Sequence, residues 1–566
     1  MKYIRRLLIF TIVMAAYDAA LMVYAIPYAW VPAVPITGAL CLRKRYNLTA
    51  HGTAKWATAK DIPHFLEGTG VSVGTIGEKI SRFEGAIALF DRSLIDEKAV
   101  QKSLTSFKPR QRPRTVCLKS MVHGIFVAPT GVGKGTSIAI PWLLKCPDSM
   151  VALDFKAELS NVTAGARRQM RQRVVILDPF LAGGGKDTFN PLADIDPMSE
   201  YAADVCRAIA SEMVVRAGTE HDPYWNSAAE FEICLAMAYV VCFADPEDKH
   251  LQSVRKLLSD SARRLGMIAQ CIQSDKWGGV LSCWGHQASQ LRDKQLDSVL
   301  SIVHTHMRFL DTPAVAANTK SSTFDPADLL KGKMTVYLVI PPEHVRTQTG
   351  LLRIWIGSML RAVVAGGLQE NRKVHYVLDE AATLGHMGIL EDAVDKYRGY
   401  GVRLLFLYQS LGQLKKCWPE GGDQTLLSNC TQVFFGINDQ PTAEYVSNRL
   451  GEATITVTNG GTGTSVSRQS SPQQGGGNYS ASTNAGWSQI GRKLLKPEEV
   501  TALDPRIAIT FTPGVPPLAT YLSRYFDGIE KSRTIGMFKA VVDTTCLLVC
   551  VLVAAVMLTA AFVYPK

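Results

Sequence analysis

The stretch that most constrains the fold of this chain is residues 128–136, which read APTGVGKGT. A short apolar run typical of a strand, GIFV, precedes it, and residues 137–144 form an apolar run compatible with a helix as far as Pro141. A glycine-rich turn between a strand and a helix is the context of a phosphate-binding loop. Its glycines let backbone N–H groups curl around an anion, and the start of the helix adds partial positive charge. We therefore predict a P-loop nucleotide-binding fold.

The loop supplies the first set of candidate site residues. Lys134 brings a full positive charge for the β- and γ-phosphates of a nucleotide. The usual pattern starts with Gly and has Ser or Thr directly after the lysine, whereas Gly135 follows the lysine here. The hydroxyl that binds Mg²⁺ is therefore expected from Thr136, or else from Ser137. The candidate nucleotide-binding residues are Ala128, Pro129, Thr130, Gly131, Val132, Gly133, Lys134, Gly135 and Thr136.

A second motif, the strand-like run VHYVLDE over residues 374–380, matches the other half of a P-loop ATPase. Asp379 is expected to hold Mg²⁺ through water, and Glu380 is expected to orient and deprotonate the attacking water. The next apolar run, LLFLY, leads to Gln409, an amide at the position where a sensor of the γ-phosphate would lie. ATP and Mg²⁺ are therefore the expected cofactors, with Asp379 and Thr136 as the candidate metal ligands.

Arg398 is the third candidate catalytic residue, after Glu380 and Gln409. It lies in the sequence YRGYG, just before the strand that leads to Gln409, and the glycines leave room for a close approach. P-loop motors often bring an arginine from a neighbouring subunit to the γ-phosphate, and a guanidinium suits this role because it stays charged and offers a planar fork of donors. Arg403 is the rival, although it is closer to the strand. The alternative is that Arg398 is an ordinary surface charge.

Elsewhere, apolar runs alternate with helical stretches, which predicts an α/β fold with a parallel sheet covered on both faces. Ligands then gather at the carboxyl ends of the strands, where Asp154 and Asp178 end two of the apolar runs. Between about 198 and 310 the pattern changes, since apolar residues recur at helical spacing and residues 227–244 and 286–310 read as long helices. We expect an all-α insertion there.

Both ends of the 566-residue chain are apolar. Residues 7–42 carry a single charge, Asp18, and are compatible with two short spans, one long span or a cleaved signal peptide. Residues 544–564 carry no charge and are long enough to span a membrane or to form a buried core helix. The placement of Lys and Arg predicts that both ends are embedded in a membrane and that the body between them is cytoplasmic.

Composition adds three expectations. The formal net charge of +11 suits a polyanionic partner or an anionic membrane surface, and does not choose between them. The twelve cysteines show no metal-ligand spacing, which indicates reduced cytosolic thiols and argues against a disulfide framework or a zinc site. Residues 456–490 are rich in Gly, Ser, Thr and Gln, so we expect a flexible loop or an extended hairpin there.

Taken together, these residues resemble the type IV coupling proteins of the TraG/TraD type, which serve conjugation and type IV secretion systems. The resemblance covers about residues 51–521, and the glycine after Lys134 is similar to that family's own form of the loop. Several motifs in one order are more specific than any of them alone. The most specific lie at residues 51–58, 128–136, 153–159, 178–180, 189–192, 222–225, 378–385, 409–410 and 494–500.

The resemblance implies an ATPase of the bacterial inner membrane that forms homo-hexamers around a channel. Such a protein receives a relaxase-bound DNA strand, expected to be single-stranded, or protein effectors, and hands them to the subunits of a secretion channel. This chain departs from the family in leaving almost no room for a periplasmic loop and in its C-terminal apolar segment. The implied organisation is a membrane anchor with a helical hairpin at 1–45, a RecA-like domain at 46–195 and 321–530, an all-α domain at 196–320, and a transmembrane helix at 540–564.

Two other functions stay open at this point. A chromosome-segregation type DNA translocase of the same superfamily would need a DNA-reading C-terminal domain, and only a short segment separates Tyr521 from the last apolar run. A substrate receptor or scaffold would bind nucleotide without needing turnover, although Glu380, Gln409 and Arg398 are all in place for hydrolysis. An ATPase rate measured with and without single-stranded DNA would separate these functions.

Overall fold

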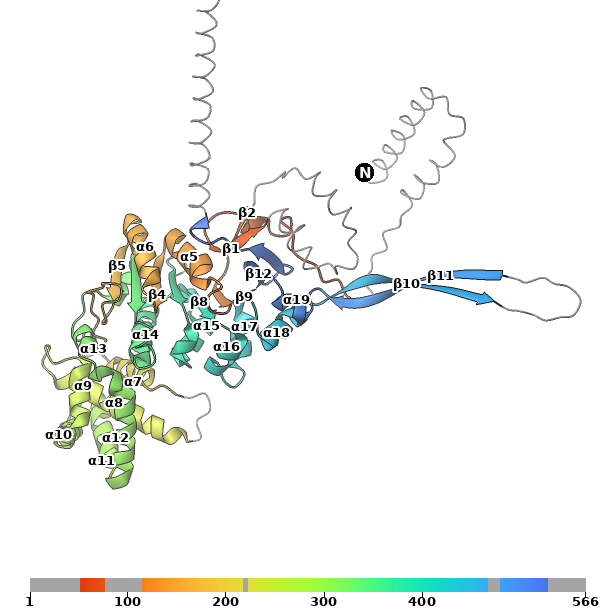
Figure 1. Ribbon diagram of the computed structural model, residues 1–566. Helices are drawn as coiled ribbons and strands as arrows, with labels where there is room; N and C mark the ends of the chain where they lie inside the picture. Colours follow the sequence, from red (N-terminus) through yellow and green to blue (C-terminus); the bar gives the residue numbers. More distant parts are fainter. Residues whose placement is uncertain (1–50, 77–113, 217–221, 370, 467–478, 528–566) are drawn as a thin grey trace, which may run out of the picture. The chain divides into compact units, whose positions relative to one another are not determined.

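The segments predicted to enter the membrane, residues 1–45 and 540–564, lie outside the residues that the structure describes. The described residues divide into two compact units, one made of residues 51–54 with the described part of Glu452–Arg492, and the other of the rest. The computed structural model describes residues 51–76, 114–216, 222–369, 371–466 and 479–527 (Figure 1).

The smaller unit is a two-stranded ribbon, in which β10 (Glu452–Val466) pairs with β11 (Tyr479–Lys493). The backbone N–H of Ala54 donates to the carbonyl oxygen of Glu452 at 3.0 Å, which ties the chain before the larger unit to the start of the ribbon. Two structures were expected for residues 456–490, a flexible loop or an extended hairpin. The described strands match the extended hairpin.

The larger unit is built on a mixed sheet of eleven strands. Seven of them, β9, β3, β8, β7, β4, β6 and β5 in spatial order, run parallel, which confirms the predicted α/β class. The other four, which the sequence did not predict, extend the sheet beyond β9 with antiparallel pairing. In spatial order the strands are β2 (Arg114–Leu118), β1 (Val71–Ile76), β13 (Leu518–Tyr521), β12 (Ile507–Phe511), β9 (Cys430–Phe435), β3 (His123–Val127), β8 (Val402–Tyr408), β7 (Val374–Leu378), β4 (Ser149–Asp154), β6 (Met334–Val339) and β5 (Arg173–Leu177).

Helices of several kinds connect these strands. The short ones are the 3-10 helices η1 (Pro63–Phe65), η5 (Lys276–Gly279), η6 (Arg308–Asp311), η7 (Pro326–Lys331), η8 (Ala381–Leu384) and η9 (Tyr397–Tyr400), and the π-helix η4 (Gly135–Ala139). The α-helices are α5 (Ile140–Lys145), α6 (Glu158–Gln169), α7 (Ala202–Met213), α8 (Pro223–Phe243), α9 (Leu251–Ser259), α10 (Ser261–Ile272), α11 (Val280–Ser289), α12 (Asp293–Met307), α13 (Pro313–Asn318), α14 (Thr349–Ala365), α15 (Gly388–Asp395), α16 (Leu411–Cys417), α17 (Gly422–Asn429), α18 (Gln440–Leu450) and α19 (Pro497–Thr501).

Helices α7 to α12 lie between β5 and β6 in the chain and gather into one cluster (Figure 1). An ion pair at 2.7 Å between Glu232 of α8 and Arg264 of α10 lies inside it, with both side chains almost completely buried. The single helix predicted over residues 286–310 is wrong. Arg292 adopts an extended backbone, with φ −135° and ψ 157°, and this residue separates α11 from α12.

Helix α8 is the one described helix that is long and apolar enough to cross a membrane, judged by length and composition only. More than half of its most apolar window is buried inside the protein, and it packs against α7, α9 and α12. Its first turn is capped by Asp222, whose side chain accepts a hydrogen bond from the backbone N–H of Tyr224 at 3.1 Å. These contacts are those of a core helix.

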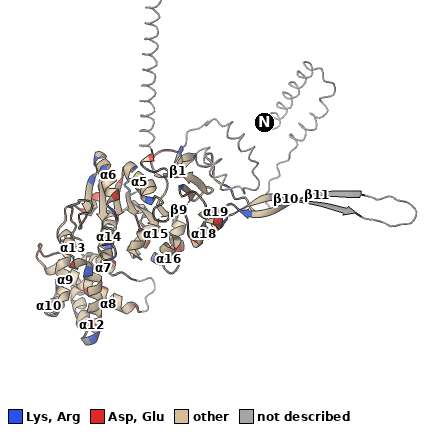
Figure 2. Ribbon diagram, viewed as in Figure 1, with Lys and Arg blue, Asp and Glu red and all other residues tan. Residues whose placement is uncertain are grey.

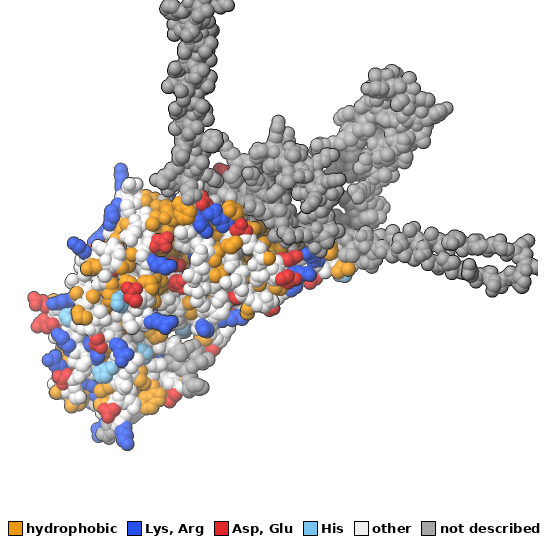
Figure 3. Space-filling view, in the orientation of Figure 1, with side chains coloured by type: hydrophobic (Ala, Val, Ile, Leu, Met, Phe, Trp, Pro, Cys, Tyr) orange, Lys and Arg blue, Asp and Glu red, His pale blue; other side chains and the backbone are white. Residues whose placement is uncertain are grey.

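Lys and Arg side chains are interspersed with Asp and Glu over the face of the larger unit that Figures 2 and 3 show. The basic surplus of the sequence therefore does not gather into one large patch on this face.

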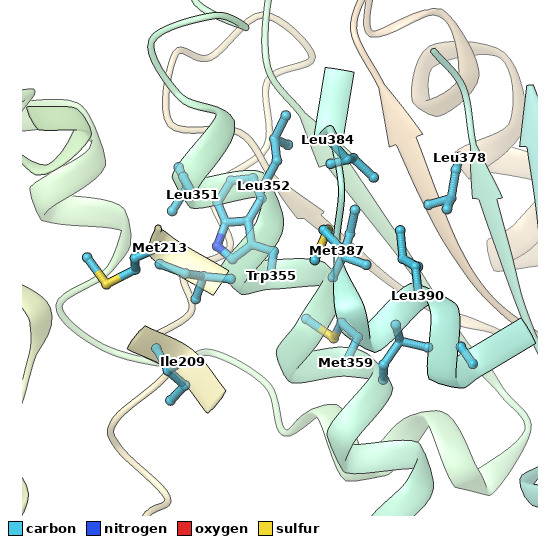
Figure 4. Packing of buried hydrophobic residues seen from close by; sticks show 14 of the residues in the cluster. Ile209, Met213, Leu351, Leu352, Trp355, Met359, Leu378, Leu384, Met387 and Leu390 are labelled. Carbon is cyan, nitrogen blue, oxygen red and sulfur yellow. The ribbon is translucent and has the colours of Figure 1, made fainter. Parts of the chain in front are cut away.

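Two apolar clusters cover the two faces of the sheet. In β3, Ile125 and Val127 belong to one cluster and Phe126 belongs to the other, as expected for a parallel strand buried on both faces. Figure 4 shows part of the first cluster, where side chains of α7 and α14 meet those of η8 and α15 around the fully buried Trp355. The helix cluster is thereby packed onto the segment that follows β7.

Candidate nucleotide site

The loop after β3 is shaped as a cradle. The strand lies between β8 and β9, and the backbone N–H of Ala128 still donates to the carbonyl oxygen of Tyr408 at 3.0 Å before the chain leaves the sheet. Gly131 and Gly133 have φ of +85° and +104°, in the region that favours glycine. A Cβ on Gly133 would lie 2.9 Å from Thr136 Oγ1, whereas one on Gly131 would meet nothing within 4 Å. The loop therefore needs glycine at Gly133 and faces open space at Gly131.

Lys134 is 7% exposed and folds back over the start of its own loop. Its Nζ donates to the carbonyl oxygens of Ala128 at 2.6 Å and Pro129 at 3.2 Å. Burial lowers the pKa of the Lys134 ammonium, and the carboxylates of Glu380 and Asp379 oppose this effect. An ammonium has three donors, so one remains for an anion in the cradle.

The two candidate hydroxyls after Lys134 differ in their exposure. Thr136 is partly exposed and its Oγ1 donates to the carbonyl oxygen of Gly133 at 3.2 Å, whereas Ser137 is buried. This difference favours Thr136 as the metal ligand. The helix also continues past Pro141, because the wide π-turn η4 leads into α5 and places the proline in the first turn of that helix, where its missing N–H is tolerated.

Carboxylates gather at the end of β7, beside the loop. The pKa of Asp379 is raised to about 6, mainly by burial and also by the negative charges of Glu380 and Asp154, while Lys134 opposes the rise. Asp154 is itself fixed, because its Oδ2 accepts from both the N–H and the hydroxyl of Ser160 at 2.8 Å. The site is therefore short of positive charge, which is a condition that a divalent cation relieves.

Asp178, the other predicted rim residue, has a local role instead. Its carboxylate accepts hydrogen bonds from the backbone N–H groups of Ala182 at 3.0 Å and Gly183 at 2.6 Å, within the turn that follows β5. Two strands, β4 and β6, separate β5 from β7 in the sheet. Asp154 therefore belongs to the carboxylates gathered near the end of β7, whereas Asp178 caps the turn that follows its own strand.

Gln409 and Glu380 are in direct contact. Gln409 follows β8 and its Nε2 donates to Glu380 Oε2 at 2.7 Å. The backbone N–H of Gln409 donates to Gln413 Oε1 at 3.0 Å, which fixes the start of the turn. Glu380 itself has a left-handed backbone with φ +54°. The predicted general base and the predicted sensor of the γ-phosphate are therefore joined across adjacent strands.

Arg398 lies at the amino ends of the strands, opposite to the end of the sheet that holds Gln409. It belongs to η9, before the amino end of β8, while Gln409 follows the carboxyl end of the same seven-residue strand. At about 3.3 Å per residue this separates them by roughly 20 Å. The Arg398 side chain is exposed, and no described residue forms an ion pair or hydrogen bond with its guanidinium. It is therefore outside the site of its own subunit.

The neighbours of Arg398 have local explanations. Arg403 donates through Nη1 to the carbonyl oxygens of Arg398 at 3.0 Å and Val402 at 2.8 Å, so it supports the turn before β8. Gly401 has φ +84°, and a Cβ there would lie 2.2 Å from the carbonyl oxygen of Arg372. This glycine is therefore needed inside the subunit.

Sequence reasoning missed one segment that touches the loop. After β13, the backbone N–H of Tyr525 donates to the carbonyl oxygen of Thr136 at 3.0 Å, which brings Arg524 beside Gly133. No motif marks this stretch, which reads SRYFD, and only the three-dimensional pairing of β13 with β12 and β1 reveals it.

The chain is similar to proteins of conjugation and type IV secretion. A family model described as type IV secretory system conjugative DNA transfer matches residues 82–545. The conjugal transfer protein TraG of Rhizobium radiobacter is 28% identical over 429 residues, which cover 73% of this chain and 63% of that protein. The type IV secretion system-coupling protein VirD4 of Bartonella quintana is 28% identical over 417 residues, covering 71% and 63%. The chain thus spans less than two thirds of the length of these relatives.

Solved structures share the fold. The bacterial conjugative coupling protein TrwBdeltaN70, in its unbound form, has a TM-score of 0.54 and 17% identity, and the match covers 71% of this chain and 84% of that one. The plasmid coupling protein TrwB in complex with ADP and Mg²⁺ has a TM-score of 0.52 and 17% identity, with 71% and 85% covered. At this identity the similarity is one of fold.

Proposed function

The chain belongs to the type IV secretory system conjugative DNA transfer family, and we propose that it is an inner-membrane coupling protein, a P-loop ATPase that recruits substrates and drives their transfer into a type IV secretion channel. The observation that carries the proposal is the contact of Gln409 Nε2 with Glu380 Oε2 at 2.7 Å, beside the loop of Lys134. In support of the proposal, Glu380, Gln409 and Lys134 follow the carboxyl ends of three adjacent strands, where α/β folds bind ligands.

ATP and Mg²⁺ fit the residues of this site. The open side of the cradle at Gly131 and the third donor of Lys134 suit a phosphate chain, and the crowded carboxylates suit a divalent cation. Thr136 and Asp379 would hold Mg²⁺, which prefers oxygen ligands and keeps several waters. When bound, Mg²⁺ neutralises charge that develops on the phosphates. The structures of TrwB in complex with ADP and Mg²⁺ support this assignment by similarity of fold.

Hydrolysis would then use the residues of this chain in defined roles. Glu380 accepts the proton of the attacking water as the general base, and the amide of Gln409 holds the Glu380 carboxylate in place. Lys134 and the backbone N–H groups of the loop bind the phosphates and stabilise the charge that builds on them.

A further positive charge at the γ-phosphate would come from a neighbouring subunit. Arg398 is exposed and lies at the amino ends of the strands, away from the loop, so it can reach a nucleotide only in another subunit. A trans-acting arginine is worth roughly 10³–10⁵ in rate in well-studied P-loop enzymes. We propose a homo-oligomer, a hexamer by analogy with the family, in which Arg398 of one subunit completes the site of the next.

The substrates would be DNA, protein effectors or both. The relatives include conjugal transfer proteins and type IV secretion coupling proteins, which supports a single DNA strand with its relaxase as cargo and channel subunits as partners. A formal net charge of +11 is favourable for binding a polyanion. The deciding experiment measures the ATPase rate of the full chain with and without single-stranded DNA. Stimulated turnover is expected, and nucleotide binding without any turnover would instead indicate a receptor or scaffold.

The membrane arrangement is a further part of the proposal. Basic residues flank the apolar stretch at residues 7–42 and precede the one at residues 544–564, which predicts that the body is cytoplasmic and that both ends are anchored. Reporter fusions at Tyr46 and Lys566 test it. Tyr46 is expected to report the cytoplasm and Lys566 the opposite side. A cytoplasmic signal at Lys566 would show that the last apolar segment does not cross the membrane.

A further inference from the structure

The segment after β13 is held firmly against the nucleotide loop. The backbone N–H of Leu522 donates to the carbonyl oxygen of Arg506 at 2.8 Å, and that of Tyr525 donates to Thr136 at 3.0 Å. The Asp527 carboxylate accepts from the backbone N–H of Arg524 at 2.9 Å and pairs with Arg506 at 3.2 Å. These bonds fix the backbone on both sides of Arg524, so its side chain starts from a fixed position beside the loop.

The Arg524 side chain lies where the cradle has its tightest turn. Its Nε is 3.8 Å from the position that a Cβ on Gly133 would occupy, and Thr136 Oγ1 is 2.9 Å from the same position. The Nε of Arg524 is buried, yet no described residue accepts a hydrogen bond from it. Buried N–H donors nearly always have an acceptor, because leaving one without a partner costs the free energy of its lost hydration.

Among the described residues, no carboxylate forms an ion pair with the guanidinium of Arg524. Both oxygens of the Asp527 carboxylate lie within 3.4 Å of the guanidinium of Arg506. The guanidinium carbon of Arg524 lies 5.9 Å from the centroid of the Phe526 ring, whose face can hold a cation but accepts no strong hydrogen bond. A charged, partly buried donor group is thus left beside a loop whose backbone is shaped for an anion.

We propose that Arg524 binds the phosphate chain of the nucleotide from the Gly133–Thr136 side of the loop. This proposal rests on the proposed nucleotide site and adds to it a cation that comes from the other end of the chain. Lys134 folds toward Ala128 and Pro129 at the beginning of the loop, so the two cations flank the cradle. A guanidinium suits the position because it stays charged and presents several donors in one plane to phosphate oxygens.

The test measures binding of ADP with Mg²⁺ to the full-length protein by equilibrium fluorescence titration. Arg524→Gln is expected to weaken ADP binding roughly 10- to 100-fold, the range for loss of a hydrogen bond to a charged group. Arg524→Lys keeps the charge and should lose less. Arg449→Gln is the matched control, because Arg449 also lies over aromatic rings, those of Tyr445 and Phe511, and is exposed on α18. It should bind ADP as the wild type does.

A second measurement separates binding from folding. The melting temperature of Arg524→Gln without nucleotide should equal that of the wild type, while its rise on adding ADP should be smaller. A lower melting temperature together with wild-type affinity in the folded protein would make Arg524 a structural residue and overturn the proposal. Lys134→Ala separates a failure of the Arg524 proposal from a failure of the proposed nucleotide site. If it abolishes ADP binding while Arg524→Gln leaves binding unchanged, the nucleotide site stands and the role of Arg524 is refuted. If neither variant changes binding, the nucleotide site itself is misplaced.

Discussion

Replacing Glu380 by Gln removes a base while changing little else in the site. Glu380 Oε2 accepts a hydrogen bond from Gln409 Nε2 at 2.7 Å, and the side-chain oxygen of a glutamine at 380 can accept the same bond. Glu380 has a left-handed backbone, with φ +54°, and Gln meets the same backbone strain as Glu. Folding and nucleotide binding are therefore expected to survive the substitution.

The expected magnitude follows from the loss of proton transfer alone. A positioned general base contributes on the order of 10²–10⁴ in rate. At about 1.36 kcal/mol for each factor of ten, this raises the activation free energy by roughly 2.7–5.4 kcal/mol. Lys134 and the loop remain, so binding of ATP should stay close to that of the wild type.

The assay is phosphate release by the full-length protein at saturating ATP, with ATP affinity measured on the same preparation. Glu444→Gln serves as the control. Glu444 also accepts a hydrogen bond from a glutamine amide, that of Gln440 at 2.8 Å, but it lies exposed on α18. It should hydrolyse ATP at the wild-type rate. Normal turnover in Glu380→Gln, with normal affinity, would show that another group takes the proton.

Three further predictions follow from the same structure. Lys134→Ala is expected to abolish ATP binding, because it removes the only loop charge aimed at the phosphates, and unchanged affinity in a titration would exclude this loop. Arg398→Ala should bind ATP without hydrolysing it, and mixing it with Glu380→Gln should restore some turnover, since some interfaces then pair two intact residues; mixed oligomers without rescue would contradict a trans role. Burial lowers the pKa of His123 from 6.5 to about 3, so the stability it contributes is complete above about pH 6.5 and is lost as the pH falls toward 3, by about 2 kcal/mol at pH 5. His123→Asn keeps an acceptor for the backbone N–H of Leu404 and should lose less thermal stability between pH 7 and pH 5, whereas an equal loss would assign the effect to other groups.

The parts of the fold that the sequence predicted carry local signals. The loop at residues 128–136 and the run at residues 374–380 each combine an apolar strand with charged or glycine residues at its end. Because the carboxyl ends of parallel strands meet at one edge, the sequence also predicted that Lys134, Asp379 and Glu380 would be neighbours. The two carboxylates raise the pKa of Lys134, and Lys134 lowers the pKa of Asp379, as neighbours do.

The parts that were missed depend on contacts between distant segments. The antiparallel side of the sheet pairs β1 with β13, which joins Thr75 to Tyr521 across most of the chain. These strands are short, and nothing within either one specifies its partner. The position of Arg524 beside Gly133 is a consequence of that pairing, so it could not be read from a local motif. The break at Arg292 is a local feature, but the surrounding apolar periodicity concealed it.

Strand β8 gives the proposed oligomer a physical route between sites. Arg403 lies at its amino end, Arg398 precedes it in η9, and Gln409 directly follows its carboxyl end. Six of its seven residues are buried, between β3 on one side and β7 on the other, so the strand cannot bend without disturbing the core. If Arg398 contacts the γ-phosphate of a neighbouring subunit, the loss of that phosphate removes a charge partner at one end of this rigid strand. The other end holds Gln409 against Glu380, so the state of one site would bear directly on the alignment of the base in the next.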